Sequence, residues 1–241
     1  MKTCGYSKTK GFSLVEMAIV LVIIGMLLGG MLMPLSTQME QRRISETQKA
    51  LDEINQALMG FAISNGFLPC PADPTLPSGA IGAGLARART AAACTGGNNG
   101  ALPWATLGVG ETDAWGNRYT YRVTTTFADA TDGTGCSGAP RAGVSFELCS
   151  VGDAVISATS GGATLATTIP AVIVSHGRNG AGAYNTTGAQ QPVSTDADEA
   201  ENSDADIDFV NKTATATYDD LVTWISPNTL YNRMVAAGRL P

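Results

Sequence analysis

The chain opens with an unbroken apolar run that has the length of a membrane span. Residues 17–35 contain no charged residue. At about 1.5 Å per residue, a helix over this run spans roughly 28 Å, which is close to the hydrocarbon core of a bilayer. We therefore expect residues 12–35 to form a transmembrane helix. Glu16 stands near the head of this segment, where a carboxylate is costly unless a specific partner receives it.

A different pattern follows residue 35, where one apolar stripe runs along an otherwise polar segment. Apolar residues recur at spacings of three, four and seven, with acidic and basic residues between them. The stripe consists of Ile44, Leu51, Ile54, Leu58 and Phe61. Residues 36–65 are predicted to continue the same helix with one face free to pack a domain. Asn65-Gly66 is a suitable C-terminal stop for it.

Short strands and glycine-rich loops predict a separate head over residues 66–241. Tyr119, Tyr121 and Val123 alternate with polar residues, which predicts a half-buried strand. The predicted strands are residues 118–123, 143–151, 169–177 and 218–226. A short helix is expected to follow Ser226, with Pro227 at its first position. The expected fold class is α+β, with the long helix packed on an antiparallel β-sheet head.

Charge indicates on which side of a membrane the head lies. The formal net charge is −6, so nucleic acid is not an expected partner. Lys2, Lys8 and Lys10 precede the apolar run, and no acidic residue accompanies them. A positive stub before an apolar run predicts a cytoplasmic N-terminus and a translocated body.

Cysteine content agrees with an extracytoplasmic head. Four of the five cysteines lie in the head, and an even number is compatible with two disulfides. Three pairings of Cys70, Cys94, Cys136 and Cys149 are open. The pairs Cys70–Cys94 and Cys136–Cys149 are favoured because each closes a glycine-rich loop. A zinc site is less expected, since the chain has one histidine and no closely spaced cysteine pair.

Seven of the 21 acidic residues fall within residues 196–208, with no basic residue among them. Such a run is often a solvated loop. It also offers the carboxylate oxygens that Ca²⁺ prefers. The candidate ligands are Asp196, Asp198, Glu199, Asp204, Asp206 and Asp208. Both interpretations remain open at this point.

The N-terminal stretch KGFSLVEMAIVLVIIGML closely resembles the cleavage and methylation signal of type IV pilins and of the pseudopilins of type II secretion. The matching positions are Gly11, Phe12 and Glu16. The resemblance implies that a prepilin peptidase removes leader residues 1–11 and methylates the new amine of Phe12. It further implies that Glu16 neutralises the amine of a neighbouring subunit when the helices bundle into a filament core.

A second, weaker resemblance lies in the head. The stretch DAWGNRYTY, residues 113–121, resembles the Asp-x-Trp-Gly-x-x-Tyr turn of the major pseudopilins of type II secretion. In those proteins a later acidic loop binds calcium, which favours Ca²⁺ as a cofactor of residues 196–208. The greater length and the four head cysteines depart from that group. A minor pilin or minor pseudopilin with an enlarged head fits better.

The expected function is therefore that of a structural subunit and not of an enzyme. The expected location is the inner membrane, crossed once with the head in the periplasm, and then a pilus or pseudopilus. The expected partners are prepilin peptidase, other pilin or pseudopilin subunits, the inner-membrane assembly platform and membrane lipid.

The alternative is a signal-anchored periplasmic binding protein or enzyme whose N-terminus matches by chance. The sequence has no G-x-S-x-G, H-E-x-x-H or phosphate-binding loop motif. His176 follows Ser175 directly, and adjacent strand residues point to opposite faces, which does not suit a nucleophile and its base. His176 is expected to be a turn residue.

Overall fold

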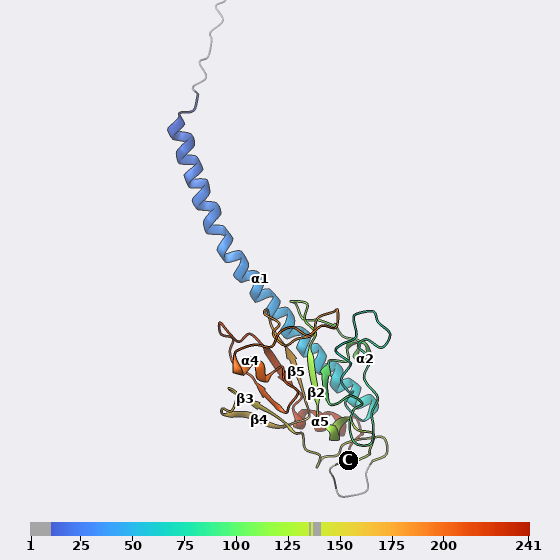
Figure 1. The fold of residues 1–241 in the computed structure, drawn as a ribbon. Coiled ribbons are helices and arrows are strands. Elements are labelled where there is room, and N and C mark those ends of the chain that lie inside the picture. The colour runs from blue at the N-terminus through green and yellow to red at the C-terminus, as the bar shows by residue number, and fades with distance from the viewer. Residues whose placement is uncertain (1–10, 135, 137–140) are drawn as a thin grey trace, which may run out of the picture. The chain divides into compact units, whose positions relative to one another are not determined.

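The computed structural model describes residues 11–134, 136 and 141–241, and the side chains of residues 27–36 lie outside the described set. Figure 1 shows a long helix and a mixed α/β head. The helices are α1 (Leu14–Asn65), α2 (Trp104–Leu107), α3 (Thr125–Ala128), α4 (Ala197–Glu201) and α5 (Pro227–Ala236). The strands are β1 (Asn99–Ala101), β2 (Thr120–Val123), β3 (Ala154–Ser157), β4 (Thr164–Ile169), β5 (Ala171–Ser175), β6 (Asp208–Val210) and β7 (Leu221–Trp224). The expected α+β class is confirmed.

Helix α1 confirms that the helix expected over residues 12–35 continues through residues 36–65. The chain divides into two compact units, one ending at Arg43 and the other covering Ile44–Pro241. Among the described side chains, no helix is long and apolar enough to cross a membrane. The predicted membrane segment 12–35 includes residues 27–35, whose side chains lie outside the described set.

The centre of the head is a four-stranded antiparallel sheet in the order β1-β2-β5-β7. Tyr121 on β2 pairs with Ile173 on β5, and both side chains join a core that includes Leu51 and Leu58 of α1. The apolar stripe that follows residue 35 therefore packs against one face of this sheet, as the sequence predicted.

The other face of the same sheet is covered by a second layer. A three-stranded sheet in the order β4-β3-β6 contains one parallel pair, β3 with β6. Ile156 and Phe209 of this layer form a second core with Val172 and Val174 of β5. Because both of its faces are covered, all five residues of β5 are buried. The strand predicted over residues 169–177 is therefore formed by the central strand β5 at residues 171–175, whereas Ile169 ends β4.

The predicted half-exposed strand over residues 118–123 is wrong in one respect. Tyr119, Tyr121 and Val123 are buried as expected, but the intervening arginines are buried too. Arg122 donates from Nη1 to Oδ1 of Asp153 at 2.6 Å. Asp153, directly before β3 of the second layer, pairs with Arg122, whereas Arg118 is enclosed by loops that include Pro74, Leu76 and Glu111.

The predicted strand over residues 143–151 is not formed. Val144 and Phe146 are buried, but Leu148 is half exposed, and the segment consists of turns. The backbone N–H of Glu147 donates to Oγ of Ser150 at 2.9 Å, and that hydroxyl donates to the carbonyl of Thr134. Local side-chain hydrogen bonds of this kind compete with strand pairing.

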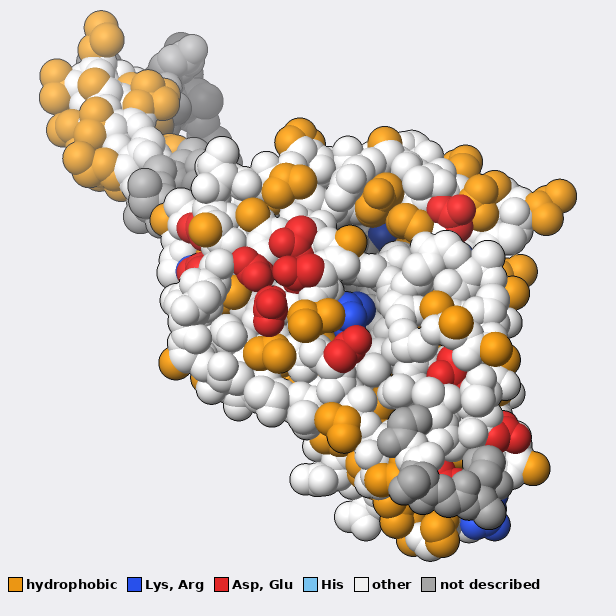
Figure 2. Space-filling view, turned by 60° about the horizontal axis from the view of Figure 1, so that its bottom comes forward, with side chains coloured by type: hydrophobic (Ala, Val, Ile, Leu, Met, Phe, Trp, Pro, Cys, Tyr) orange, Lys and Arg blue, Asp and Glu red, His pale blue; other side chains and the backbone are white. Residues whose placement is uncertain are grey.

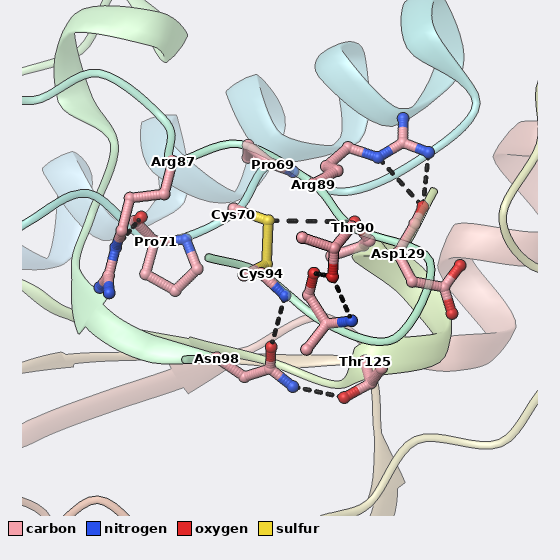
Figure 3. The surroundings of a disulfide bond; sticks show 12 residues. Pro69, Cys70, Pro71, Arg87, Arg89, Thr90, Cys94, Asn98, Thr125 and Asp129 are labelled. Carbon is pink, nitrogen blue, oxygen red and sulfur yellow. Dashed lines mark hydrogen bonds between the residues drawn. A yellow bond between two sulfur atoms is a disulfide. The ribbon is translucent and has the colours of Figure 1, made fainter. Parts of the chain in front are cut away.

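Two disulfides join Cys70 to Cys94 and Cys136 to Cys149, the pairs that the loop spacing favoured. Figure 3 shows the first pair, where Oδ1 of Asn98 accepts a hydrogen bond from the backbone N–H of Cys94 at 3.2 Å. Arg87 donates from Nε to the carbonyl of Pro71 at 2.8 Å. The glycine-rich loop is thus tied by a covalent bond and by side chains that replace regular backbone pairing.

The C-terminal elements are confirmed. Strand β7 lies within the predicted segment 218–226, and α5 begins at Pro227 directly after its N-cap residue Ser226. Gly238 follows the helix with a φ of 69°, a value that favours glycine.

Candidate functional site

The residues of the expected processing signal lie at the start of α1 and are accessible. Gly11 and Phe12 precede the first helical residue, and Phe12 is 84% exposed. A peptidase requires an extended, accessible bond, and no helical hydrogen bond of the described residues protects the Gly11–Phe12 bond.

Ser13 and Glu16 form a reciprocal cap on this helix. The backbone N–H of Ser13 donates to Oε2 of Glu16 at 2.8 Å, and the backbone N–H of Glu16 donates to Oγ of Ser13 at 3.2 Å. This is the capping-box arrangement, which satisfies two otherwise unpaired backbone donors. The pattern Ser-x-x-Glu before an apolar run is its sequence signal, and the interpretation of Glu16 from the sequence missed it.

The apolar side chains that follow are largely exposed. Leu14 is 90% exposed and Leu21 is 67% exposed. A contiguous apolar surface of this kind marks contact with lipid or with other proteins. The start of α1 therefore combines an accessible Gly11–Phe12 bond, a capped carboxylate and an exposed apolar surface.

The acidic run 196–208 is a folded segment with several separate roles. Asp196 is the N-cap of α4, where its Oδ1 accepts from the backbone N–H of Asp198 at 3.0 Å. Asp198 also forms an ion pair with Lys212. Figure 2 shows acidic side chains gathered on one face of the head. Among the described residues, the six predicted calcium ligands do not form one group, since Glu199 lies with Asp219 and Asp220 whereas Asp204 and Asp206 lie with Glu201.

Glu199 is instead turned inward and meets two acids that the sequence analysis did not select. One carboxylate oxygen from each of Glu199, Asp219 and Asp220 lies within 4.8 Å of the others. Glu199 is 1% exposed and Asp220 is 2% exposed. Asp219 and Asp220 directly precede β7, which carries them to the edge of the central sheet. Two adjacent acids at the head of an apolar strand were the signal that would have found them.

Each of the three carboxylates is anchored through one oxygen. Glu199 Oε1 accepts from Nδ2 of Asn179 at 2.7 Å, and Asp220 Oδ2 accepts from Nδ2 of Asn202 at 2.8 Å. Asp219 Oδ2 accepts from the backbone N–H of Asn179 at 3.2 Å. The Oδ1 atoms of Asp219 and Asp220 are buried and have no hydrogen-bond partner among the described residues. Buried oxygens without donors are costly, and a hard cation would relieve that cost.

The pKa values of Asp219 and Asp220 also suit the binding of a cation at this three-carboxylate cluster. Burial raises the pKa of Asp220 to about 8, and nearby carboxylates add to the effect. Burial also raises the pKa of Asp219. Without a counter-charge, three close carboxylates resist ionisation together, whereas a divalent ion favours their ionised forms. A surface cavity is lined by Asn179 and by Glu199, the one member of the cluster that borders it.

A second acidic group, formed by Glu201, Asp204 and Asp206, lies on the surface. Partial burial and the neighbouring Asp206 raise the pKa of Asp204 to about 6. These side chains are open to water, and exposed acids are commonly solvated without an ion.

His176 follows β5 directly at the start of a turn, where its carbonyl accepts from the backbone N–H of Gly180 at 3.0 Å, and its side chain is fully buried. Its Nε2 lies 2.8 Å from Oγ1 of Thr120, and its Nδ1 lies 3.9 Å from Oδ1 of Asp220. Burial lowers the pKa of His176 to about 4, so its imidazole is neutral at pH 7. Ser175 donates to Asp113 at 2.7 Å and does not meet His176 as a nucleophile would.

Comparison with known proteins gives one positive result. No curated protein matches the chain, and no solved structure matches it. The family defined by the prokaryotic N-terminal methylation motif matches residues 6–32, which include Gly11, Phe12 and Glu16. The chain thus carries the N-terminal methylation motif that is the signature of type IV pilin and pseudopilin precursors.

Proposed function

We propose that the protein is a structural subunit of a type IV pilus or of a type II secretion pseudopilus. The observation that carries the proposal is the methylation motif at the head of a long helix whose first turns expose apolar side chains. A prepilin peptidase would cut between Gly11 and Phe12 and methylate the amine of Phe12. The enlarged, disulfide-linked head fits a minor subunit.

Assembly would depend on Glu16 and the exposed apolar surface of α1. In a bundle of such helices, the carboxylate of one subunit would meet the amine of Phe12 in the next. A buried charge is tolerated when it is paired, and removal of one partner leaves the other unpaired. Glu16 would therefore set the register between subunits while the apolar residues supply the contact area.

The proposed location follows from the same signal. Before assembly, the helix would anchor the subunit in the inner membrane, with the head in the periplasm. The two disulfides suit an oxidising compartment. The assembly platform of the inner membrane, other pilin or pseudopilin subunits and membrane lipid would be its partners.

The N-terminal mass of the membrane-extracted chain tests this proposal. Peptide mass spectrometry would compare cells that contain prepilin peptidase with cells that lack it. A peptide that begins at methylated Phe12 only when the peptidase is present supports the pilin route. An intact Met1, or a cut beyond Pro34, contradicts that route and leaves a signal-anchored periplasmic protein as the better description.

We further propose that the head binds Ca²⁺ at the three-carboxylate cluster of Glu199, Asp219 and Asp220. The support is the pair of buried Asp219 and Asp220 oxygens that have no hydrogen-bond donor among the described residues. This set retains Glu199 from the ligands expected within residues 196–208 and replaces the other five. A bound ion would hold α4 against the start of β7, two segments that are otherwise connected through Asn179 and Asn202.

A further inference from the structure

The head contains a pocket of mixed polar and apolar lining that neither the N-terminal signal nor the three-carboxylate cluster uses. It has a volume of about 260 Å³, just below the roughly 300–1,000 Å³ typical of small-molecule sites. It lies at the β1–β2 edge of the central sheet, beside the loops that carry residues 182–190 and 203–205. We call it the β1–β2 pocket. The residues that the argument uses are Asn99, Thr120, Tyr184, Gln190, Asp204 and Ala205.

The shape of the β1–β2 pocket is built by close approach of two segments. Gly182 has a φ of 78°, and a Cβ on it would lie 2.2 Å from Cβ of Ser203. Asn99 donates from Nδ2 to the carbonyl of Asp204 at 3.2 Å, which ties the sheet edge to the opposite wall. The walls are therefore held in place without a ligand, as preformed sites usually are.

The lining excludes an anionic ligand. Arg118 borders the pocket, but its guanidinium already donates to five groups around it. These acceptors are Glu111, Ser78 and the carbonyls of Pro74, Leu76 and Thr186. A guanidinium has five N–H donors, so none remains for a phosphate or carboxylate. The nearby carboxylate of Asp204 adds to the repulsion of an anion.

The lining combines small apolar residues with polar side chains, which suits a ligand that has both C–H and hydroxyl groups. Among the described residues, those around the pocket include no leucine, isoleucine, valine or phenylalanine. Gln190 uses Nε2 to bond the carbonyl of Gly182 at 3.0 Å, which leaves its Oε1 without a partner among the described residues. Asn99 Oδ1 and the Tyr184 hydroxyl are likewise unpaired within the described part of the chain. Amide, hydroxyl and carboxylate groups beside one aromatic residue suit a ligand rich in hydroxyl groups.

We propose that the β1–β2 pocket binds a single neutral sugar residue. Sugar hydroxyls both donate and accept hydrogen bonds, which matches the free amide oxygens, the Tyr184 hydroxyl and the carboxylate of Asp204. The proposal goes beyond the filament role and does not depend on it, because the pocket lies wholly within the head unit. A subunit with this pocket would attach to a glycan-bearing surface.

Saturation-transfer NMR on the full chain tests the proposal. The chain is held in a zwitterionic detergent without sugar groups, and the probes are the methyl glycosides of glucose, galactose, mannose and N-acetylglucosamine. We expect transfer to at least one glycoside. Ala205→Trp, which fills the pocket, should abolish the signal. Gln190→Ala should weaken binding by about three- to tenfold, the effect of losing one hydrogen bond.

Ala189→Trp is the matched control, because Ala189 is exposed and outside the lining. It should bind as the unaltered chain does, and both tryptophan variants should keep the same thermal unfolding midpoint. Absence of transfer to all four glycosides overturns the proposal. So does a signal that survives Ala205→Trp, or binding of butylamine or inorganic phosphate in place of the sugars.

Discussion

Ser13 and Glu16 satisfy each other's backbone at the first turn of α1, with the Ser13 N–H lying 2.8 Å from Oε2 of Glu16. The carboxylate that the filament proposal assigns to a neighbouring amine is therefore already engaged within its own chain. The filament proposal therefore gives Glu16 two separable roles, one in starting the helix and one in contact between subunits. Capping requires an acceptor oxygen, whereas pairing with an amine requires a charge.

Replacement of Glu16 distinguishes these roles. Glu16→Gln keeps a side chain that suits a capping box but removes the charge, whereas Glu16→Val removes both. We expect both variants to be processed and both to reduce the filament fraction recovered by shearing by about tenfold or more, because a neighbouring amine would be left unpaired. Ser13→Ala is the control, since it weakens the cap and leaves the charge. Normal assembly of Glu16→Gln together with failure of Ser13→Ala would show that capping is what matters.

Calcium should raise the thermal stability of the full chain. At a free Ca²⁺ concentration about 100 times the dissociation constant, the expected gain is about 2.7 kcal/mol. For a protein of this size, that gain corresponds to a rise of roughly 5–10 °C in the unfolding midpoint. The measurement is differential scanning calorimetry with excess EDTA and then with Ca²⁺, accompanied by luminescence of bound Tb³⁺.

Two substitutions show which of the two acidic groups binds the ion. Asp219→Asn should remove most of the midpoint shift and the Tb³⁺ signal, because it removes the charge of a central ligand. Asp206→Asn, in the exposed acidic group, should leave both unchanged. Retention of the shift in Asp219→Asn with its loss in Asp206→Asn would move the ion to the surface group.

Asp153→Asn should destabilise the head by about 1–3 kcal/mol at pH 7. Removal of one partner from a fully buried ion pair costs about 3–5 kcal/mol. Here Arg122 is buried but the Asp153 side chain is 43% exposed, so the expected cost is smaller. Burial alone would raise the pKa of Asp153, but hydrogen bonds from Arg122 and Thr124 outweigh it and lower the pKa below its usual value.

The pH dependence follows from that direction. A lowered folded-state pKa contributes stability that is present above the unfolded value of about 3.9 and is lost as the pH falls through the lower folded value. The difference in unfolding free energy between Asp153→Asn and the unaltered chain should therefore shrink from pH 7 to pH 3 in urea titrations. Asp52→Asn, on the exposed side of α1, should show no such trend.

Loss of the Cys70–Cys94 disulfide should cost about 3–4 kcal/mol. The two residues are 24 apart in sequence, and a cross-link over such a loop restricts the unfolded chain by about that amount. The double variant Cys70→Ala/Cys94→Ala, compared in urea with Cys136→Ala/Cys149→Ala, measures it. A much smaller loss would show that Arg87 and Asn98 hold the loop without the covalent bond.

Local patterns in the sequence were sufficient for the long helix, the central strand β5 and the disulfide pairs. Burial is predicted directly by two patterns, the apolar stripe from Ile44 to Phe61 and the five apolar or small residues of β5. Arg118 and Arg122 gave the opposite impression, because alternation reports polarity and not exposure. Only the tertiary structure supplies Asp153 beside β3, which pairs with Arg122, and the loops that enclose Arg118.

The sequence did not predict the three-carboxylate cluster, for a related reason. The high density of acidic residues selected the segment 196–208, but it does not indicate which of these side chains is buried. Glu199 does so because α4 has one buried face, and it meets Asp219 and Asp220 from a segment that reads as the start of a strand. When residues that are far apart in the sequence meet in this way, no periodic pattern in the sequence indicates it.

The second half of α1 belongs to the core of the head and also continues the N-terminal helix. Leu51 and Leu58 share that core with Tyr121 and Ile173, and Arg239 near the C-terminus donates from Nε to the carbonyl of Ile63 at 2.7 Å. A force that pulls the segment from Ile44 to Asn65 away from the head therefore acts on many packed side chains at once. Such packing resists stepwise detachment, because these side chains must lose their contacts together.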